Sequence, residues 1–288
     1  MEDPLVSIVL PTYNRRALLL EAVSSVLHQS YTRWELLIAD DGSTDDSLAS
    51  LPADPRIRVI RLPHTGNVAR VRNAALQEAA GTLVGFLDSD DRWRPEKLTR
   101  QVARLRLRPD AGWCFGQHAL IDEHGRGTPM RSGLPWQPRE GALIGAILTS
   151  NAGVAMQTVL VRRDIAAGIG FDERIPFADD HDFLVRLAFA SSACVVDEVV
   201  ADVREHAGRT TLERYDQTLG IAMAYRSYRA MVADPELKRV CARRSWSLIR
   251  TYLARARAAG ALPRGMTNLM RAWRELHRKR PPSRRVAK

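Results

Sequence analysis

The chain has 288 residues, of which 45% are hydrophobic and 26% charged, a composition that excludes a disordered chain and allows a sizeable folded core. Its three cysteines, Cys114, Cys194 and Cys241, are widely spaced and match no zinc pattern, so we expect buried thiols rather than a disulfide scaffold. The net charge of +10 is concentrated at the C-terminal end, because residues 238–288 hold 16 Lys and Arg with a single acid, whereas residues 1–237 hold 27 basic and 32 acidic residues.

The first hundred residues alternate patterns typical of strands with patterns typical of helices. Strands are predicted at 5–10, 35–39, 57–62 and 82–87, and amphipathic helices at 16–29, 44–51 and 66–80. Such alternation predicts a doubly wound α/β sheet, whose ligands bind at the carboxyl ends of the strands. The polar residues that directly follow each strand are therefore the candidates for a functional site.

The following hundred residues continue with both kinds of element. The predicted order is a helix at 95–108, a strand at 113–121 with a turn at 123–127, a helix near 140–148, a strand near 154–162, a loop around 170–173, a helix near 180–190 and a strand near 194–203. From about residue 211 the pattern predicts helices only. We therefore expect an α/β body followed by a helical, basic extension.

The N-terminal residues show no signal-peptide pattern, because Met1-Glu2-Asp3 leads directly into a strand pattern. The uncharged stretch at 141–161 approaches the length of a membrane span, but polar residues interrupt it and Gly153 divides it. We therefore expect a cytoplasmic protein, with peripheral attachment to the inner face of the membrane as an option that depends on the basic tail.

Polar segments follow the first two predicted strands, at Pro11-Thr12-Tyr13-Asn14 and at Asp40-Asp41-Gly42-Ser43-Thr44-Asp45. The ring of Tyr13 could stack on a nucleobase, and the Asp41 carboxylate could accept the imide N–H of uracil or thymine. Taken alone, Asp-Gly-Ser-Thr is equally an ordinary turn and helix cap. The helix after the third strand carries Arg72, and a helix N-terminus with an arginine can hold phosphate oxygens, with solvated surface arginines as the alternative.

The most specific signal is the acidic run Asp88-Ser89-Asp90-Asp91, which directly follows the apolar segment at 83–87. Its carboxylates emerge together at the ligand-binding edge and would repel one another unless a cation offsets their charge. Hard oxygen ligands suit Mg²⁺ or Mn²⁺, which keep open positions for substrate phosphates. For the run by itself, a loop that caps the helix beginning at Pro95 is the alternative, but its place after two other polar strand ends favours the cation site.

These segments, together with Arg72-Asn73 and the continuation Arg92-Trp93, resemble family 2 glycosyltransferases of the GT-A fold over about residues 5 to 210. The resemblance implies an inverting enzyme that uses a UDP- or dTDP-sugar and Mn²⁺ or Mg²⁺, bound at a DXD motif, in cell-surface glycan or glycoconjugate synthesis. It implies a mixed sheet with a Rossmann-like nucleotide-sugar half at 1–100 and an acceptor half at 101–210. The helical basic extension at 211–288 lies outside the likeness.

The resemblance also implies roles for individual residues. The nucleotide-binding residues would be Pro11, Tyr13, Asp41, Arg72 and Ser89. The metal would be held by Asp90, with Asp88 and His206 of a late Arg-x-His segment as further ligands, and the acceptor by Asp179 and Trp93. The catalytic base would be Asp180, in a segment at 177–183 that resembles the Glu-Asp acceptor motif with Asp179 in place of Glu.

The chemistry of glycosyl transfer also requires a base such as the Asp180 carboxylate, independently of the resemblance. The acceptor hydroxyl must lose a proton as it attacks the anomeric carbon, and a positioned carboxylate can take that proton. A cation would stabilise charge on the departing diphosphate, and a single displacement inverts the anomeric centre. By themselves, Asp179 or Asp180 could equally cap the helix that follows, and His206 could be an exposed loop histidine.

The basic tail predicts two amphipathic helices. Their apolar stripes are Leu237, Val240, Cys241, Leu248, Ile249, Tyr252 and Leu253 in the first, and Met266, Leu269, Met270, Trp273 and Leu276 in the second. These stripes predict packing on the body or on a second subunit. The arginines outside them allow attachment to an anionic membrane, which would bring the site close to a lipid-linked acceptor. Glycans, small molecules and peptides are the other acceptor classes.

Three other functions fit parts of the sequence. A nucleotidyltransferase would also need metal-binding aspartates, but it would carry a glycine-rich phosphate loop where residues 11–14 stand. Nucleic-acid binding through the tail agrees with a pI near 10.1, but no recognised motif supports it. A non-catalytic protein that binds nucleotide-sugars is the third, and the presence of both Asp90 and Asp180 argues against it.

Overall fold

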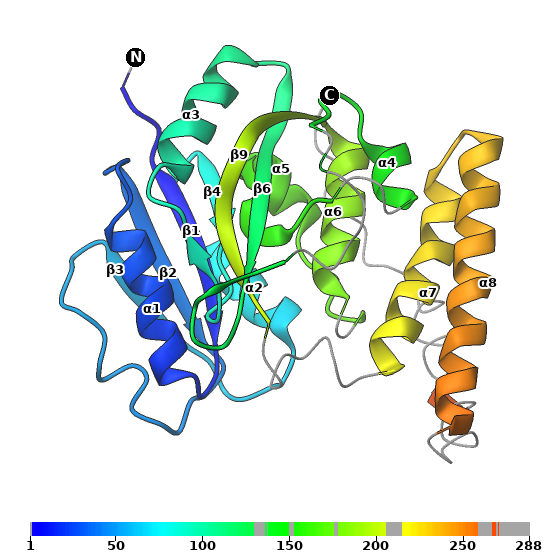
Figure 1. Ribbon diagram of the computed structural model, residues 1–288, viewed down its shortest axis with the longest axis horizontal. Coiled ribbons are helices and arrows are strands. Elements are labelled where there is room, and N and C mark those ends of the chain that lie inside the picture. Colours follow the sequence, from blue (N-terminus) through cyan, green and yellow to red (C-terminus); the bar gives the residue numbers. More distant parts are fainter. Residues whose placement is uncertain are drawn as a thin grey trace.

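The structure is a computed structural model that describes residues 2–129, 136, 138–149, 153–175, 178–205, 215–258, 267–268 and 270. In this part of the chain, a nine-stranded mixed sheet has helices on both faces (Figure 1). The strands are β1 (Val6–Thr12), β2 (Trp34–Asp40), β3 (Ile57–Arg61), β4 (Leu83–Phe86), β5 (Arg92–Trp93), β6 (Ala111–Ile121), β7 (Gly127–Thr128), β8 (Leu160–Arg162) and β9 (Ser192–Arg204). They lie in the order β3-β2-β1-β4-β8-β6-β9-β5, with β7 paired to β6.

Two apolar cores separate the sheet from its helices. One core lies between the sheet and α1 (Arg16–Leu27) and α3 (Lys97–Leu107). The other is formed with α2 (Val68–Gln77), α4 (Ile144–Leu148), η1 (Met156–Thr158), α5 (Arg163–Ile169) and α6 (Asp179–Ala190). Strand β1 supplies both, because Ile8 and Leu10 face the first core and Val9 the second. This arrangement confirms the predicted doubly wound α/β sheet.

Parallel pairing brings the polar strand ends to one edge. Strand β1 pairs in parallel with β2, where Thr12 lies opposite Asp40, and with β4, where Val9 lies opposite Phe86. The loops after these three strands are therefore neighbours, as expected for ligand binding in an open α/β sheet. On the other side of β4 the sheet becomes mixed, because β8 runs antiparallel to β4 and β6.

The helix expected at 44–51 is absent, and this prediction is wrong. Turns occupy residues 46–50 instead. The Asp45 carboxylate accepts hydrogen bonds from the backbone N–H and the hydroxyl of Ser47, and the hydroxyl of Ser50 donates to the backbone oxygen of Asp46. Such local side-chain bonds compete with helical backbone bonds, which explains why an acidic, serine-rich segment folds as turns.

The helices of the C-terminal extension pack on the α/β body. Helix α7 (Tyr215–Met231) contributes to the core shared with α6, and the Tyr228 hydroxyl donates to the buried carboxylate of Asp182 (3.1 Å). Helix α8 (Pro235–Ala258) lies antiparallel beside α7 on the far side of α6 from the sheet (Figure 1), and Ser245 bonds to the backbone of Ala222. In the first predicted apolar stripe, Leu237, Val240, Cys241 and Leu248 pack against the core shared with the body, whereas Tyr252 and Leu253 pack on Leu219 and Met223 of α7. The second stripe, at 266–276, lies almost entirely outside the described residues.

The three cysteines are free and buried, as predicted. No helix among the described residues is long and apolar enough to cross a membrane. The stretch at 141–161 instead contains α4, η1 and the start of β8, apart from residues that the structure does not describe. Its polar residues therefore belong to the folded body.

A fully buried lysine lies beneath the acidic loop. The Lys97 ammonium lies 4.6 Å from the centre of the Trp93 ring and donates to the side-chain oxygen of Gln101 and to the backbone oxygen of Thr158. Burial lowers the pKa of Lys97 from 10.5 to about 7. Its charged form therefore reduces the stability of the fold near neutral pH.

We expect this cost to show in the pH dependence of unfolding. Between pH 7 and 10.5 the unfolded chain binds more protons at Lys97 than the folded chain, so the free energy of unfolding rises with pH in that window. Chemical denaturation of wild type and Lys97→Met should therefore show that the variant has the larger free energy of unfolding at pH 7. This difference should shrink by a few kcal/mol from pH 7 to pH 10, since one pKa unit is worth about 1.4 kcal/mol. Parallel pH curves for the two proteins would contradict this expectation.

Candidate active site

The acidic run forms a cluster at the carboxyl edge of the sheet. One carboxylate oxygen from each of Asp88, Asp90 and Asp91 lies within 4.8 Å of the others. The three residues are not equivalent, because Asp91 is buried and accepts the backbone N–H of Arg204 (2.7 Å), whereas Asp88 and Asp90 are partly exposed. The donor set is made of hard carboxylate oxygens and fits Mg²⁺ or Mn²⁺. Asp90 and Asp88 are the accessible ligands.

Two arginines contact this acidic cluster, one through a carboxylate and the other through the backbone. Arg15, directly after β1, forms an ion pair with the carboxylate of Asp90. Arg204, at the end of β9, is 1% exposed and donates through Nε to the backbone oxygen of Asp90 (2.9 Å). Its guanidinium also contacts Glu21 and the backbone oxygens of Asp122 and Glu123. Arg204 therefore fixes the acidic loop against β9.

A third arginine joins the acidic cluster to α6. The guanidinium of Arg72 is 5% exposed, and it donates to Asp88 (2.5 Å) and to Asp179 in the first turn of α6. The other Asp88 oxygen accepts from the Gln157 amide (2.7 Å). Burial alone would lower the pKa of Arg72, but the charges of Asp88, Asp179 and Asp180 outweigh it and raise that pKa. Arg72 is therefore a charged bridge between two parts of the site that are distant in sequence.

Replacement of this bridge should destabilise the fold strongly. In Arg72→Met, two carboxylates would lose their cation, one of them on a residue that is 6% exposed, and breaking such a buried pair costs about 3–5 kcal/mol. Arg70→Met is the matched control on the exposed face of the same helix, where we expect a change within about 0.5 kcal/mol. Urea denaturation of the two variants measures the difference. Equal stability of Arg72→Met and Arg70→Met would show that the bridge contributes nothing.

Asp180 lies in the first turn of α6 and is exposed. The N-cap of this helix is Ala178, which makes no side-chain hydrogen bond to the helix. Neither Asp179 nor Asp180 is therefore the N-cap, which was the alternative role considered for them from the sequence. The Asp180 carboxylate accepts the backbone N–H of His181 (2.6 Å). Its solvent-facing position beside the buried Arg72–Asp179 pair makes it the accessible carboxylate at this end of α6.

The loops after β1 and β2 form a second, aromatic part of the edge. The ring of Tyr13 is 40% exposed and stacks on His64, with ring centres 4.2 Å apart. The Asp41 carboxylate is 5% exposed and accepts from Thr65 N and Oγ1 and from Gly66 N (2.8–3.0 Å), while His64 Nδ1 lies 3.1 Å from it. Asp41 therefore holds the 64–66 turn against the β2 loop and sets the position of the Tyr13–His64 stack.

Several residues that were expected to contact a ligand are buried in the structure. Pro11 lies within β1, where it pairs with Ala39, and Ser89 is 4% exposed, so neither side chain is open to solvent. Trp93 is 3% exposed, and a Cβ added to Gly85 would lie 2.7 Å from its ring, so the ring is packed in the core. Its indole N–H is satisfied by the backbone oxygen of Gln157 (2.9 Å).

Arg72 and Asp179 are buried as well. Asp179 was expected to bind the acceptor and Arg72 the ribose or diphosphate, and in the structure the two residues form an ion pair with each other. Burial raises the pKa of Asp179, and the charge of Arg72 opposes that rise. Their role is therefore internal to the site. His206, expected to be a metal ligand, lies outside the described residues.

Three residues at this edge were not predicted from the sequence. Arg15 directly follows the Pro11–Asn14 segment, Gln157 lies in a stretch that was notable only for its polar interruptions, and His64 lies in a loop with no motif. For Arg15, the charge next to a polar strand end was a usable signal. The other two depend on contacts between segments far apart in the chain.

A mixed α/β sheet with an acidic cluster after its fourth strand and an exposed aspartate on a neighbouring helix is the arrangement expected for a glycosyltransferase of the GT-A type. Residues 7–167 match the sequence profile of Glycosyl transferase family 2. The chain therefore belongs to this family of glycosyltransferases, and the predicted family, fold and enzyme class are confirmed.

Individual relatives agree with this assignment. The chain is 36% identical over 126 residues to UDP-Glc:alpha-D-GlcNAc-diphosphoundecaprenol beta-1,3-glucosyltransferase WfgD of Escherichia coli, a match that covers 43% of this chain and 49% of that protein. The match thus spans about half the length of this curated relative. S. aureus TarS 1–349 in complex with UDP-GlcNAc has a TM-score of 0.63 at 19% identity, over 94% of this chain and 90% of that one.

A second solved structure shows the same fold. The mannosyltransferase PcManGT from Pyrobaculum calidifontis, in complex with GDP-Man and Mn²⁺, has a TM-score of 0.63 at 18% identity and covers 96% of this chain and 82% of that chain. At these identities the structural likeness establishes the fold. The two neighbours carry different nucleotides, so the shared fold does not decide the nucleotide.

Proposed function

We propose that this chain transfers a sugar from a UDP- or dTDP-sugar to a hydroxyl of a lipid-linked saccharide in cell-surface glycan synthesis, with inversion at the anomeric carbon. The observation that carries the proposal is the Arg72 bridge, because it ties the metal-ligand candidate Asp88 to the helix turn that presents Asp180. Residues 1–100 would bind the donor and residues 101–210 the acceptor, with 211–288 as a helical extension.

The donor would bind along the edge formed by the first three loops. The exposed ring of Tyr13 offers a stacking surface for the base, and the turn held by Asp41 sets its position. The buried ion pairs of the site keep Arg72 from contacting the donor, so Arg15 is the partly exposed cation closest in sequence to the base-binding loop. The UDP-Glc named for WfgD supports a uracil donor.

Asp90, assisted by Asp88, would hold Mn²⁺ or Mg²⁺ beside the diphosphate. Such an ion supplies charge neutralisation for the departing nucleotide diphosphate. Arg15 then has to leave the Asp90 carboxylate or share it, and its position directly after β1 would let it contact a phosphate oxygen at short range. Asp91 keeps its structural bond to the backbone of Arg204.

Asp180 would act as the general base. Its exposed carboxylate would accept the proton of the attacking acceptor hydroxyl, whereas Asp179 beside it is buried and paired with Arg72. The buried pair fixes the start of α6, and Asp180 would face the donor from this turn. The diphosphoundecaprenol-linked substrate in the name of WfgD supports a polyprenyl-diphosphate saccharide as the acceptor class.

Thermal shift with a panel of nucleotides tests the donor class. We expect UDP- or dTDP-sugars with Mn²⁺ to raise the melting temperature, since a ligand at 100 times its Kd adds about 2.7 kcal/mol of stability, and we expect GDP-sugars to do so less. Stabilisation by GDP-sugars alone would overturn the uracil or thymine assignment. Family membership sets aside the nucleotidyltransferase alternative.

A further inference from the structure

Helix α8 has one buried face and one exposed, cationic face. The buried face consists of Cys241, Ser245, Ile249, Tyr252 and Ala256. The opposite face, which we call the α8 arginine face, consists of the exposed residues Arg239, Arg243, Trp246, Arg250 and Arg257. Their spacing of four, three, four and seven residues places them along one side of the helix. The sequence contains no Asp or Glu from Leu237 to Ala258, so the face is uniformly positive.

These arginines differ from four exposed arginines of the body that form ion pairs. On the body, Arg33, Arg58, Arg100 and Arg106 are each paired with a carboxylate, namely those of Glu2, Glu78, Glu198 and Asp3. Among the described residues, no ion pair or hydrogen bond is found for the side chains of the four α8 arginines. Their positive charge is therefore not compensated within the described part of the fold.

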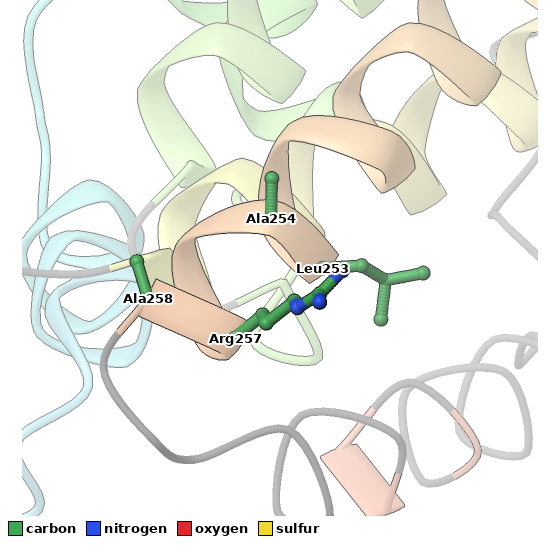
Figure 2. A pocket seen from close by; sticks show the side chains of 4 residues that line it. All are labelled: Leu253, Ala254, Arg257 and Ala258. Atoms are coloured by element: carbon green, nitrogen blue, oxygen red, sulfur yellow. The ribbon is translucent and has the colours of Figure 1, made fainter.

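Apolar surface accompanies this charge. Trp246, at the middle of the face, is 63% exposed, although a tryptophan of a soluble helix is ordinarily buried. Near the C-terminal end of α8 an open hollow is lined by Leu253, Ala254, Arg257 and Ala258, and Figure 2 shows Leu253 and Arg257 projecting from the helix. This hollow lies on α8, away from the strand ends that carry the candidate active site (Figure 1). It therefore belongs to a different surface.

We propose that the α8 arginine face binds the surface of an anionic lipid bilayer. Basic side chains near such a surface are attracted by its negative potential, and tryptophan is enriched at the boundary between headgroups and acyl chains. A helix with a cationic, aromatic outer face can lie in the plane of that boundary. A second copy of the chain is a poor partner, because two such faces would repel each other.

This proposal goes beyond the proposed function and is independent of the identity of the donor sugar. Helices α7 and α8 form the outermost layer on one side of the molecule, with α6 between them and the sheet (Figure 1). Contact of the bilayer with α8 would therefore leave the strand ends uncovered. A lipid-linked acceptor anchored in the same bilayer would be held near the enzyme by this contact.

Vesicle sedimentation with the full chain tests the proposal. We expect wild type to bind phosphatidylcholine vesicles that contain phosphatidylglycerol at low salt, to bind pure phosphatidylcholine weakly, and to be released by high salt. Replacement of the four α8 arginines by Gln should weaken binding to the anionic vesicles by at least about tenfold. The matched control, Gln at Arg33, Arg58, Arg100 and Arg106, removes the same charge and should bind nearly as wild type does.

Trp246→Ser tests whether the exposed aromatic side chain contributes to vesicle binding in addition to the charge of the arginines. It should weaken vesicle binding several-fold and remove a blue shift of tryptophan fluorescence that accompanies binding in wild type. The proposal is overturned if wild type ignores anionic vesicles, if the two four-arginine variants bind equally, or if a DNA duplex binds more tightly than the vesicles through the same arginines. It is also overturned if Trp246→Ser converts a dimer to a monomer in sedimentation velocity. Nucleotide-sugar binding, measured by thermal shift, should be unchanged in all these variants, so failure here leaves the proposed function standing.

Discussion

Asp180→Asn is expected to lower the rate of glycosyl transfer by about 10²–10⁴-fold, because a positioned general base contributes about this much to such a reaction. Asn keeps the size of the side chain but accepts no proton at neutral pH. Binding of the donor should change little, since Asp180 is exposed at the start of α6 and the buried Arg72–Asp179 pair beside it is retained. Initial rates of product formation and calorimetry with UDP measure the two effects separately.

Asp164→Asn is the matched control for this change. Asp164 is likewise an exposed aspartate in the first turn of a helix, α5, and should be replaceable with no effect on the rate. Transfer at the wild-type rate by Asp180→Asn would remove Asp180 as the base. A large loss of UDP affinity in the same variant would instead assign it to donor binding.

Asp90→Ala is expected to weaken the Mn²⁺-dependent binding of UDP by about 100-fold. The two partly exposed carboxylates of the cluster are the ligands available to a cation, and Asp90 is the one not tied to Arg72. Loss of a residue that only hydrogen-bonds to a metal ligand already lowers metal affinity by about 10–100-fold, so loss of the ligand itself should lower it at least as much. Calorimetry of UDP with Mn²⁺ and with a chelator gives the metal-dependent part of the affinity.

The metal-dependent part should be large in wild type and small in Asp90→Ala. Asp46→Ala removes an exposed carboxylate in the turn after β2 and should behave as wild type does. If the chelator leaves the UDP affinity of wild type unchanged, the cation site has been wrongly assigned. Asp91→Ala would be a poor substitute for this experiment, because Asp91 holds the backbone of Arg204 and its loss should destabilise the loop.

The polar segments that follow the strands and form the candidate active site could be predicted from the sequence, because their positions depend on local patterns. The apolar runs of β1, β2 and β4 fix where each strand ends, and parallel pairing of neighbouring strands brings Asp40 and the acidic run to one edge. Periodicity of 3.6 residues likewise predicted that Cys241, Ile249 and Tyr252 share a buried face of α8. These predictions need only the period and the order of elements.

Burial of individual polar residues could not be predicted in this way. Arg72 and Asp179 are 107 residues apart in sequence, and only the folded chain shows that they neutralise each other. Trp93 follows the acidic run directly, so its sequence position suggested the ligand edge, but the missing side chain of Gly85 leaves room for its ring in the core. In both cases a contact between distant segments decides the role of the residue.

Stereochemistry of the product tests the central claim most directly. The donor sugar that stabilises the protein best in thermal shift would be incubated with Mn²⁺ and a short polyprenyl-diphosphate saccharide, and the new glycosidic bond examined by NMR. We predict transfer with the anomeric configuration opposite to that of the donor, and we expect chelator and Asp180→Asn each to abolish it. A product that retains the donor configuration, or one formed at full rate without metal, would contradict it.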